Sequence, residues 1–177
     1  MHRKETNPNE SEYPPIAEYA YISDCHSMAL VGTSGSIDWC VMPRVDAYSV
    51  FGRLLDWNKG GYCLICPDLE SYEVSRKYLK NSLVLETIFT AGERKFKVYD
   101  CFTMHEGGRE EPFNQIIRIM EGSKGDMPVR ISLKPRFDYG MLKPWILRRN
   151  DGRDFAAIGG HQGLVISSDA QIGRAHV

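Results

Sequence analysis

Two cysteines, Cys63 and Cys66, have the close spacing that a structural zinc site uses. They lie in residues 61–67, a short apolar run that predicts a β-strand. Side chains three positions apart on a strand point to opposite faces, so the two sulfurs are expected to diverge. A zinc knuckle also needs a second pair of ligands, and the five histidines are scattered along the chain. We therefore expect buried core cysteines here, no metal and no cofactor.

A nucleophilic site is equally poorly supported. Asp24 and His26 flank Cys25, but neighbouring residues on a strand or turn diverge, and no third orienting group is evident. Ser36 follows Gly35 without the Gly-x-Ser-x-Gly context of a nucleophile elbow, which indicates a simple turn residue. We expect no catalytic residue in this chain.

The charged residues next to Trp39 have a pattern that suits carbohydrate. Arg44 and Asp46 flank Val45, so on an extended segment both point to the same side and can form a bidentate pair. An aromatic ring beside charged groups suits a sugar, which has an apolar face and a rim of hydroxyls. Two interpretations stay open: Trp39, Arg44 and Asp46 wall a sugar pocket at a domain interface, or Trp39 is a core residue and the ion pair fixes a loop.

Arg136 and Asp138 repeat this pattern late in the chain, with Phe137 between them and Tyr139 after them. We expect this segment to lock the end of a strand through hydrogen bonds. Contact across a domain interface is the alternative.

The elements that must position these residues are predicted to be strands. Most segments alternate apolar and polar residues with a period of two and are interrupted by Gly, Pro, Asn or Asp. The predicted strands are residues 37–42, 61–67, 82–90, 94–103, 114–121, 128–135, 145–149, 155–159 and 164–168. Only residues 49–56 resemble a helix, with Ser49 as its N-cap. This pattern predicts an all-β fold, an antiparallel β-sandwich.

Within these strands, alternation assigns side chains to faces. Ile37, Trp39 and Val41 are expected to share one face, and Asp38, Cys40 and Met42 the other. Phe96 and Val98 are expected on one side of their strand, together with Asp100. Residues 91–93 supply a tight hairpin turn.

The composition is that of an ordinary globular domain, with 42% hydrophobic and 25% charged residues and a net charge of −1. No run of Lys or Arg forms a basic stripe, which excludes nucleic acid as an expected partner, and no apolar stretch could span a bilayer. Residues 1–12 are polar, lack the apolar core of a secretory signal and are expected to be a disordered lead-in. Together with an odd number of cysteines, five, this indicates reduced thiols and a cytoplasmic location.

Three blocks in order resemble one known family. They are residues 13–32, beginning Tyr13-Pro-Pro-Ile-Ala-Glu-Tyr; residues 35–51, beginning Gly35-Ser-Ile-Asp-Trp39; and residues 134–145, beginning Lys134-Pro-Arg-Phe-Asp-Tyr-Gly140. Together they resemble the N-terminal, trehalase-like domain of glycoside hydrolase family 15, which contains glucoamylase- and trehalase-like proteins. Two departures stand out: Ser34-Gly35 replaces the family's usual Asp-Gly turn, and Pro43-Arg-Val-Asp-Ala-Tyr-Ser lacks the family's Phe and second Pro. The second departure is expected to soften that loop.

The resemblance implies a supersandwich-like domain over residues 13–170, truncated at its C-terminus, that packs on and supports a downstream (α/α)6 barrel. That barrel would hydrolyse α-glucosidic bonds, in trehalose or another α-glucoside, with inversion, using two carboxyl groups of its own. Residues 172–177 carry no apolar pattern and can be back-translated to a common sequencing adapter, so residues 171–177 are expected to be a non-native tail, with a natural frayed tail as the alternative. The alternative is a free-standing carbohydrate-binding sandwich that uses Trp57, Tyr62 and Trp145.

Overall fold

A computed structural model describes residues 13–149 and 153–169, and this part of the chain contains strands and two short 3₁₀ helices but no α-helix. The first sheet has the order β1-β2-β3-β5-β10, with β4 paired to β3; the second is β6-β7-β8-β9 and the third β11-β12-β13. Every pairing is antiparallel. The all-β prediction is confirmed.

The strands of the first sheet are β1 (Ala20–Ser23), β2 (Met28–Val31), β3 (Ser36–Val41), β4 (Ser49–Phe51), β5 (Tyr62–Pro67) and β10 (Val129–Lys134). Those of the second sheet are β6 (Glu73–Tyr78), β7 (Leu85–Ala91), β8 (Arg94–Phe102) and β9 (Ile116–Lys124). Those of the third sheet are β11 (Trp145–Arg149), β12 (Asp154–Gly159) and β13 (Gln162–Ser167). The 3₁₀ helices are η1 (Ile16–Glu18) and η2 (Asp138–Gly140).

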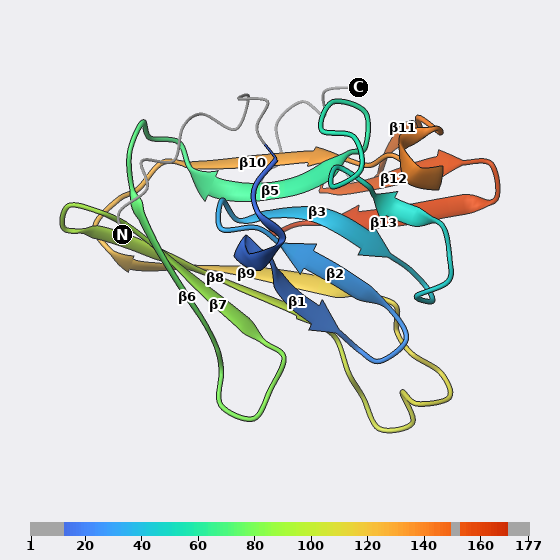
Figure 1. Ribbon diagram of the computed structural model, residues 1–177, viewed down its shortest axis with the longest axis horizontal. Helices are drawn as coiled ribbons and strands as arrows, with labels where there is room; N and C mark the ends of the chain where they lie inside the picture. Colours follow the sequence, from blue (N-terminus) through green and yellow to red (C-terminus); the bar gives the residue numbers. More distant parts are fainter. Residues whose placement is uncertain (1–12, 150–152, 170–177) are drawn as a thin grey trace.

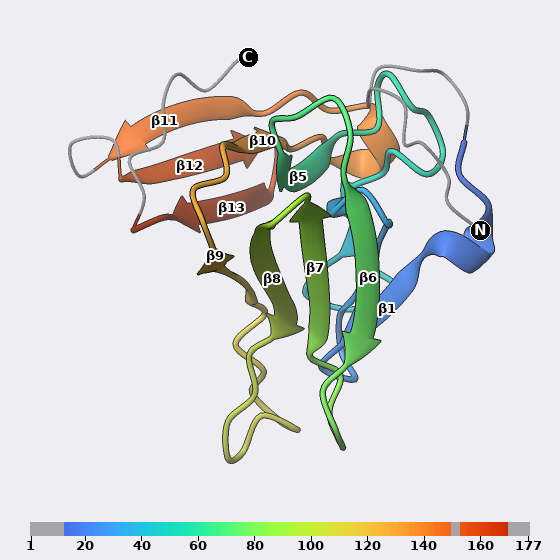
Figure 2. The ribbon, with the colours of Figure 1, turned by 90° about the vertical axis from the view of Figure 1, so that its left-hand side faces the viewer.

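The first and second sheets lie against each other as two layers (Figure 1), and the third sheet extends from one side of them (Figure 2). The main core cluster combines apolar side chains of all three sheets with Phe137, which is 1% exposed. Its members include Ile22, Ala29, Val31, Ile37 and Cys40 from the first sheet, Leu85 and Phe102 from the second and Ala157 from the third. Since burying one large apolar side chain contributes about 1.5–3 kcal/mol, this shared core is what joins the sheets into one body.

A second, smaller cluster lies at the other end of the layers. It consists of Ile65, Phe89, Phe96 and Val98, and the Phe89 and Phe96 rings stack with centroids 4.8 Å apart. Phe96, Val98 and Asp100 are all buried, as alternation along β8 predicted.

One buried ion pair also joins the two layers. Arg118 on β9 donates from Nε to Asp100 Oδ1 (2.7 Å) and from Nη2 to Oδ2 (3.2 Å). The same guanidinium donates to the carbonyl oxygens of Cys63 on β5 and Gly35 before β3, both at 2.6 Å. Asp100 is completely buried, and its carboxylate raises the pKa of Arg118 despite the opposing effect of burial. Arg118 therefore connects the second sheet to two strands of the first.

The predicted strands are all present, although some ends move: 82–90 becomes Leu85–Ala91 and 114–121 becomes Ile116–Lys124. The prediction of a helix over residues 49–56 is wrong. Ser49–Phe51 form β4, which pairs with β3, and the following residues form turns in which Leu55 N donates to Gly52 O. Tertiary pairing with β3 outweighs a local pattern too short to sustain a helix.

Two predictions concern residues outside the described part of the chain: the disordered lead-in over 1–12 and the non-native tail over 171–177. Among the residues that the structure describes, no helix is long and apolar enough to cross a membrane.

Replacing Arg118 by Ala should leave the Asp100 carboxylate buried without its cation. We expect a loss of about 3–5 kcal/mol in the free energy of unfolding, measured by urea titration with tryptophan fluorescence. The matched control is Arg130→Ala, which breaks the half-exposed Arg130–Asp68 pair and should cost about 1 kcal/mol or less. Equal losses for the two variants would contradict the role given to Arg118.

Gly35 and Gly92 provide a second matched pair, because both have positive φ angles of +80° and +62°. A Cβ at Gly35 would lie 2.2 Å from the Ile65 carbonyl oxygen, whereas a Cβ at Gly92 meets nothing within 4 Å. We expect Gly35→Ala to lower the unfolding free energy by about 3 kcal/mol or more, and Gly92→Ala by about 1 kcal/mol. Urea titrations in which the two variants lose the same stability would show that the close approach to β5 does not matter.

Candidate functional site

A β-bulge in β3 sets the geometry of the candidate site. The register of β2 against β3 pairs Leu30 with Trp39 and Val31 with Ile37, so Asp38 is one extra residue on β3. A bulge of this kind changes which face the following side chains point to.

The consequence is that Trp39 points away from the main core. Ile37 and Cys40 both belong to that core, while Trp39 lies opposite Leu30, on the other face, and stays partly exposed. The prediction that Ile37, Trp39 and Val41 share one face is therefore wrong, because alternation counts no bulge.

Trp39 belongs to an aromatic cluster that we define as Trp39, Tyr48, Tyr139 and His161. The Trp39 and Tyr139 rings stack with centroids 6.1 Å apart. Tyr48 meets Tyr139 edge-on at 6.2 Å and His161 at 5.8 Å. Tyr48 and Tyr139 are 47% and 42% exposed, so the cluster presents ring surface to solvent.

Tyr139 is held in place by its neighbours rather than by its own ring contacts alone. Phe137 is anchored in the main core, and its backbone N–H and C=O bond with those of Leu142, which closes the segment into a loop. The Tyr139 N–H donates to Ser49 Oγ at 2.8 Å, and Ser49 is completely buried. Asp138 and Tyr139 both have positive φ angles, 51° and 56°, which non-glycine residues rarely adopt. Strained backbone held by surrounding structure is typical of functional sites.

Arg44 and Asp46 form the predicted bidentate pair, with Nε–Oδ1 at 2.8 Å and Nη2–Oδ2 at 3.0 Å. Their side chains are 72% and 67% exposed, in the loop that leads to Tyr48. The hydrogen bond from Arg44 lowers the pKa of Asp46. Asp46 is therefore ionised near neutral pH and is unsuited to act as a general acid, which must carry a proton.

Arg136 and Asp138 lie apart from that pair, with no hydrogen bond or ion pair to Arg44 or Asp46 among the described residues. Arg136 donates from its backbone to Val50 O and from Nη1 to Pro135 O. Asp138 begins η2. The expected locking of this strand end occurs mainly through backbone hydrogen bonds, since neither residue's side chain bonds across to another strand in the described part.

The bulge residue Asp38 is 1% exposed and lies in a polar cluster that the sequence did not indicate. Its carboxylate accepts hydrogen bonds from the hydroxyls of Tyr19 (3.0 Å) and Ser36, and Arg53 Nη1 lies 3.6 Å from Oδ1. Burial raises the pKa of Asp38, and the contacts from Ser36, Arg53 and Tyr19 oppose that rise. Ser36 is thus a buried residue of β3, and its prediction as a simple turn residue is wrong.

Arg53 lies between two aromatic rings, with its guanidinium carbon 3.8 Å from the Trp57 centroid and 4.3 Å from that of Tyr62. Such cation–π contacts cover the faces that a sugar would need. Trp57 and Tyr62 therefore do not form an open stacking surface, although the sequence singled them out for that role.

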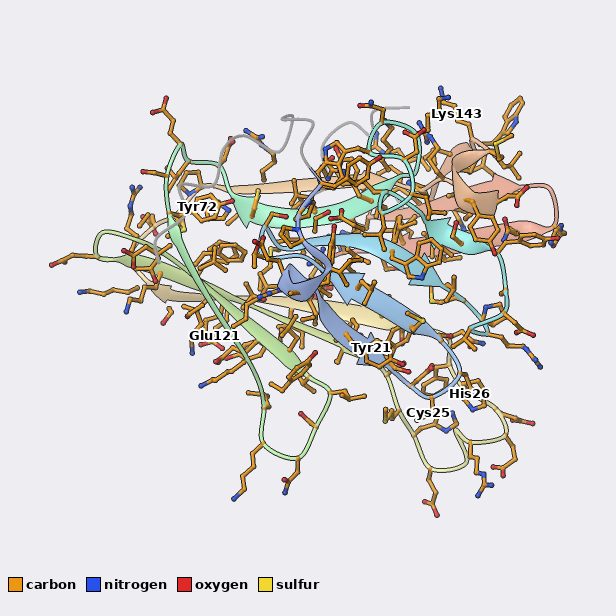
Figure 3. All side chains as sticks on the ribbon, in the orientation of Figure 1. Tyr21, Cys25, His26, Tyr72, Glu121 and Lys143 are labelled. Atoms are coloured by element: carbon orange, nitrogen blue, oxygen red, sulfur yellow. The ribbon has the colours of Figure 1, made fainter. Side chains whose placement is uncertain are left out.

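The remaining sequence candidates have structural roles. Asp24 Oδ1 accepts from the backbone N–H groups of His26 (2.9 Å) and Ser27 (2.6 Å), so it organises the turn between β1 and β2, where Figure 3 shows Cys25 and His26. Cys63 and Cys66 lie on β5, as predicted, and Cys63 packs against the main core. Within the described ranges, no group of three or more His, Cys, Asp or Glu side chains could hold a metal.

Tyr48 and His161 were missed by sequence reasoning. Tyr48 occupies the place of the family's second Pro, so the departure itself was the available signal. His161 follows Gly160 in the turn between β12 and β13 and carried no signal, because only the fold brings the third sheet next to β4. The assembled cluster can stack on the apolar face of a ring, and it lacks the paired carboxyl groups of a glycosidase centre.

The raised pKa of Asp38 makes a prediction about stability and pH. In the unfolded chain Asp38 ionises near its ordinary pKa of about 3.9, whereas in the folded protein it ionises at a higher pH. The contribution of Asp38 to stability is therefore lost as the pH rises from the unfolded pKa through the folded pKa. Over this interval, the unfolding free energy of the wild type should fall relative to that of Asp38→Asn. Urea titrations of both proteins at several pH values measure this difference.

Asp46→Asn is the control, because the pKa of Asp46 is lowered and the pH-dependent difference should have the opposite sign. A difference between wild type and Asp38→Asn that does not change with pH would contradict the effect of burial on Asp38.

The family model and the relatives that match this chain all concern trehalases. The family model described as "Trehalase-like, N-terminal" matches residues 6–170. The chain is 33% identical over 141 residues to a trehalase of Mycolicibacterium smegmatis, covering 72% of the chain and 21% of that protein. It is 30% identical to a trehalase of Mycobacterium tuberculosis over 77% of the chain, and 35% identical to trehalase 1 of Sulfolobus acidocaldarius over 76%, in each case 22% of the relative.

No solved structure matches the chain. The chain spans about a fifth of the length of the curated relatives it matches. Because the family model covers nearly the whole chain, including the bulged β3 and the loop of Tyr139, this protein belongs to the trehalase-like N-terminal domain family.

Proposed function

We propose that this chain is the non-catalytic N-terminal domain of a trehalase-like glycoside hydrolase and that it packs on and supports a separate catalytic domain. The observation that carries the proposal is coverage: the chain matches trehalases over most of its own length, yet spans only about a fifth of theirs. The remaining four fifths leave ample room for a domain that holds the reaction.

The family resemblance assigns that reaction to an (α/α)6 barrel acting on trehalose or another α-glucoside, with inversion. Inversion requires one protonated and one ionised carboxyl group with a water between the second and the sugar. In the candidate site the carboxyl groups have other roles: Asp46 pairs with Arg44, and Asp38 is buried beneath Arg53. This supports placing the catalytic carboxyl groups in the downstream domain.

The aromatic cluster is the part of this domain that we propose to face the substrate pocket or the domain interface. Trp39 belongs to it, Arg44 and Asp46 precede Tyr48, and Arg136 and Asp138 precede Tyr139. Exposed rings from separate segments, beside an ion pair, suit a disaccharide with apolar faces and a rim of hydroxyls.

A free-standing carbohydrate-binding module is less well supported. It would need Trp57, Tyr62 and Trp145 as a stacking surface, but two of these rings cover Arg53. We also propose a cytoplasmic location, supported by the five cysteines, which are not joined by disulfides.

The test of the proposed function is glucose release. The full-length protein that contains this domain should release glucose from trehalose, and the 177-residue chain should release none. Maltose serves as the comparison substrate. A full-length protein that is folded but releases no glucose from any α-glucoside would overturn the proposal.

The aromatic cluster makes a sharper prediction in the full-length protein. Tyr139→Ala removes one exposed ring, and a stacking loss of about 1–1.5 kcal/mol should lower kcat/KM for trehalose about tenfold. Phe113→Ala is the matched control, since Phe113 is 60% exposed and stacks on His105 instead. Unchanged kcat/KM for Tyr139→Ala, with an unchanged melting temperature, would exclude the cluster from the substrate-facing surface.

A further inference from the structure

The third sheet has an apolar outer face that the described part of the chain leaves open. Cross-strand register places its side chains in two rows, Trp145–Ile158–Gly163 and Leu147–Ala156–Val165. Neither row contains a charged or hydrogen-bonding side chain other than the indole N–H. A third row, Arg149–Asp154–Ser167, is polar and marks one end of this apolar face.

Four of the large side chains on this face are open to solvent, whereas the small Ala156, between Leu147 and Val165, is 8% exposed. Trp145 is 79% exposed, Val165 64%, Leu147 50% and Ile158 44%. On the opposite face of the same strands, Ala157 is completely buried and Ile146, Leu164 and Ile166 pack against the main core.

Apart from the Arg149–Asp154–Ser167 row and Arg148, which shares the inner face with Phe155 and Ile166, the sheet is apolar on both faces. An antiparallel sheet with one face in water normally alternates apolar and polar residues, whereas a sheet covered on both sides does not. A contiguous exposed apolar patch of this kind is typical of an interaction surface.

We propose that the polypeptide following β13 in the full-length protein packs an apolar surface onto this face. The inference rests on the proposed function, in which this chain is one domain of a longer hydrolase. Two observations select this occupant. The chain matches about a fifth of the length of the curated relatives, and the family model that it matches is described as N-terminal. In addition, β13 is both the last described strand and an edge strand of this sheet.

Because the following polypeptide leaves from the sheet itself, it can cover the face with little loss of loop entropy. The absence of charge in the two rows requires an apolar partner surface, since a charged one would be desolvated without compensation. The polar row at Arg149 indicates that the covering element lies over the Trp145 end of the face.

Cysteine labelling in the full-length protein tests the proposal. Val165→Cys places a thiol in the Leu147–Ala156–Val165 row of the face with a small decrease in volume, and Glu93→Cys places one in the β7–β8 turn, where Glu93 is 90% exposed. Both are made in a Cys25→Ser background, since Cys25 is the exposed native thiol. The labelling rate with a maleimide is read by peptide mapping, native and in urea.

We expect Cys at position 165 to react at least about tenfold more slowly in the native protein than Cys at position 93, with equal rates in urea. Equal native rates would overturn the proposal. Slow labelling at position 165 that becomes fast on dilution, together with a dimer in light scattering, would overturn it in favour of a second copy on this face.

Glucose release from trehalose, measured on the same two variants, separates this proposal from the proposed function. If labelling at position 165 is fast and the protein still releases glucose, the docking proposal is contradicted and the proposed function stands. If labelling at position 165 is slow at every protein concentration but the folded protein releases no glucose, the docking surface is supported and the proposed function is contradicted.

Discussion

The arrangement of the two layers depends on where Arg118 directs its hydrogen bonds. Its guanidinium donates hydrogen bonds to the completely buried carboxylate of Asp100 and to the carbonyl oxygens of Gly35 and Cys63. Removing two charges from water is costly, so such a pair contributes specificity of arrangement more readily than net stability. Because the two carbonyls belong to the turn before β3 and to β5, one side chain fixes the first sheet over the second at the place where β3 begins.

A second set of polar contacts fixes the other border of the layers. Arg76 on β6 donates to the carbonyls of Val31 (2.9 Å) and Glu18 (2.7 Å), and the Tyr78 hydroxyl bonds to the backbone N–H and C=O of Tyr21. These groups are backbone atoms of η1, of the edge strand β1 and of the end of β2. Apolar packing between the layers has no direction of its own, so the directional bonds at both borders decide how the sheets are aligned.

With β3 held at its start by Arg118, the bulge at Asp38 divides its side chains between two environments. Ile37 and Cys40 stay in the main core, Asp38 enters the polar cluster with Tyr19 and Arg53, and Trp39 turns toward Tyr139. The candidate site thus exists because the strand departs from regular alternation at one residue.

Much of the fold followed from the sequence alone. Alternation and turn residues predicted β3, β5 and the strands from β7 to β13, the hairpin at Gly92 and the burial of Phe96, Val98 and Asp100, since these patterns are carried by residues close in the sequence. The pairing of Arg44 with Asp46 was likewise local, and three ordered blocks indicated the family.

Only the tertiary structure decided the rest. The strand at Ser49 exists because β3 pairs with it, and the bulge that redirects Trp39 is defined by the register against β2. The aromatic cluster joins β3, the Tyr48 loop, η2 and the turn of His161, which lie far apart in the sequence. A local pattern records the preference of one segment, whereas these features depend on the positions of several segments at once, which packing and long-range hydrogen bonds determine.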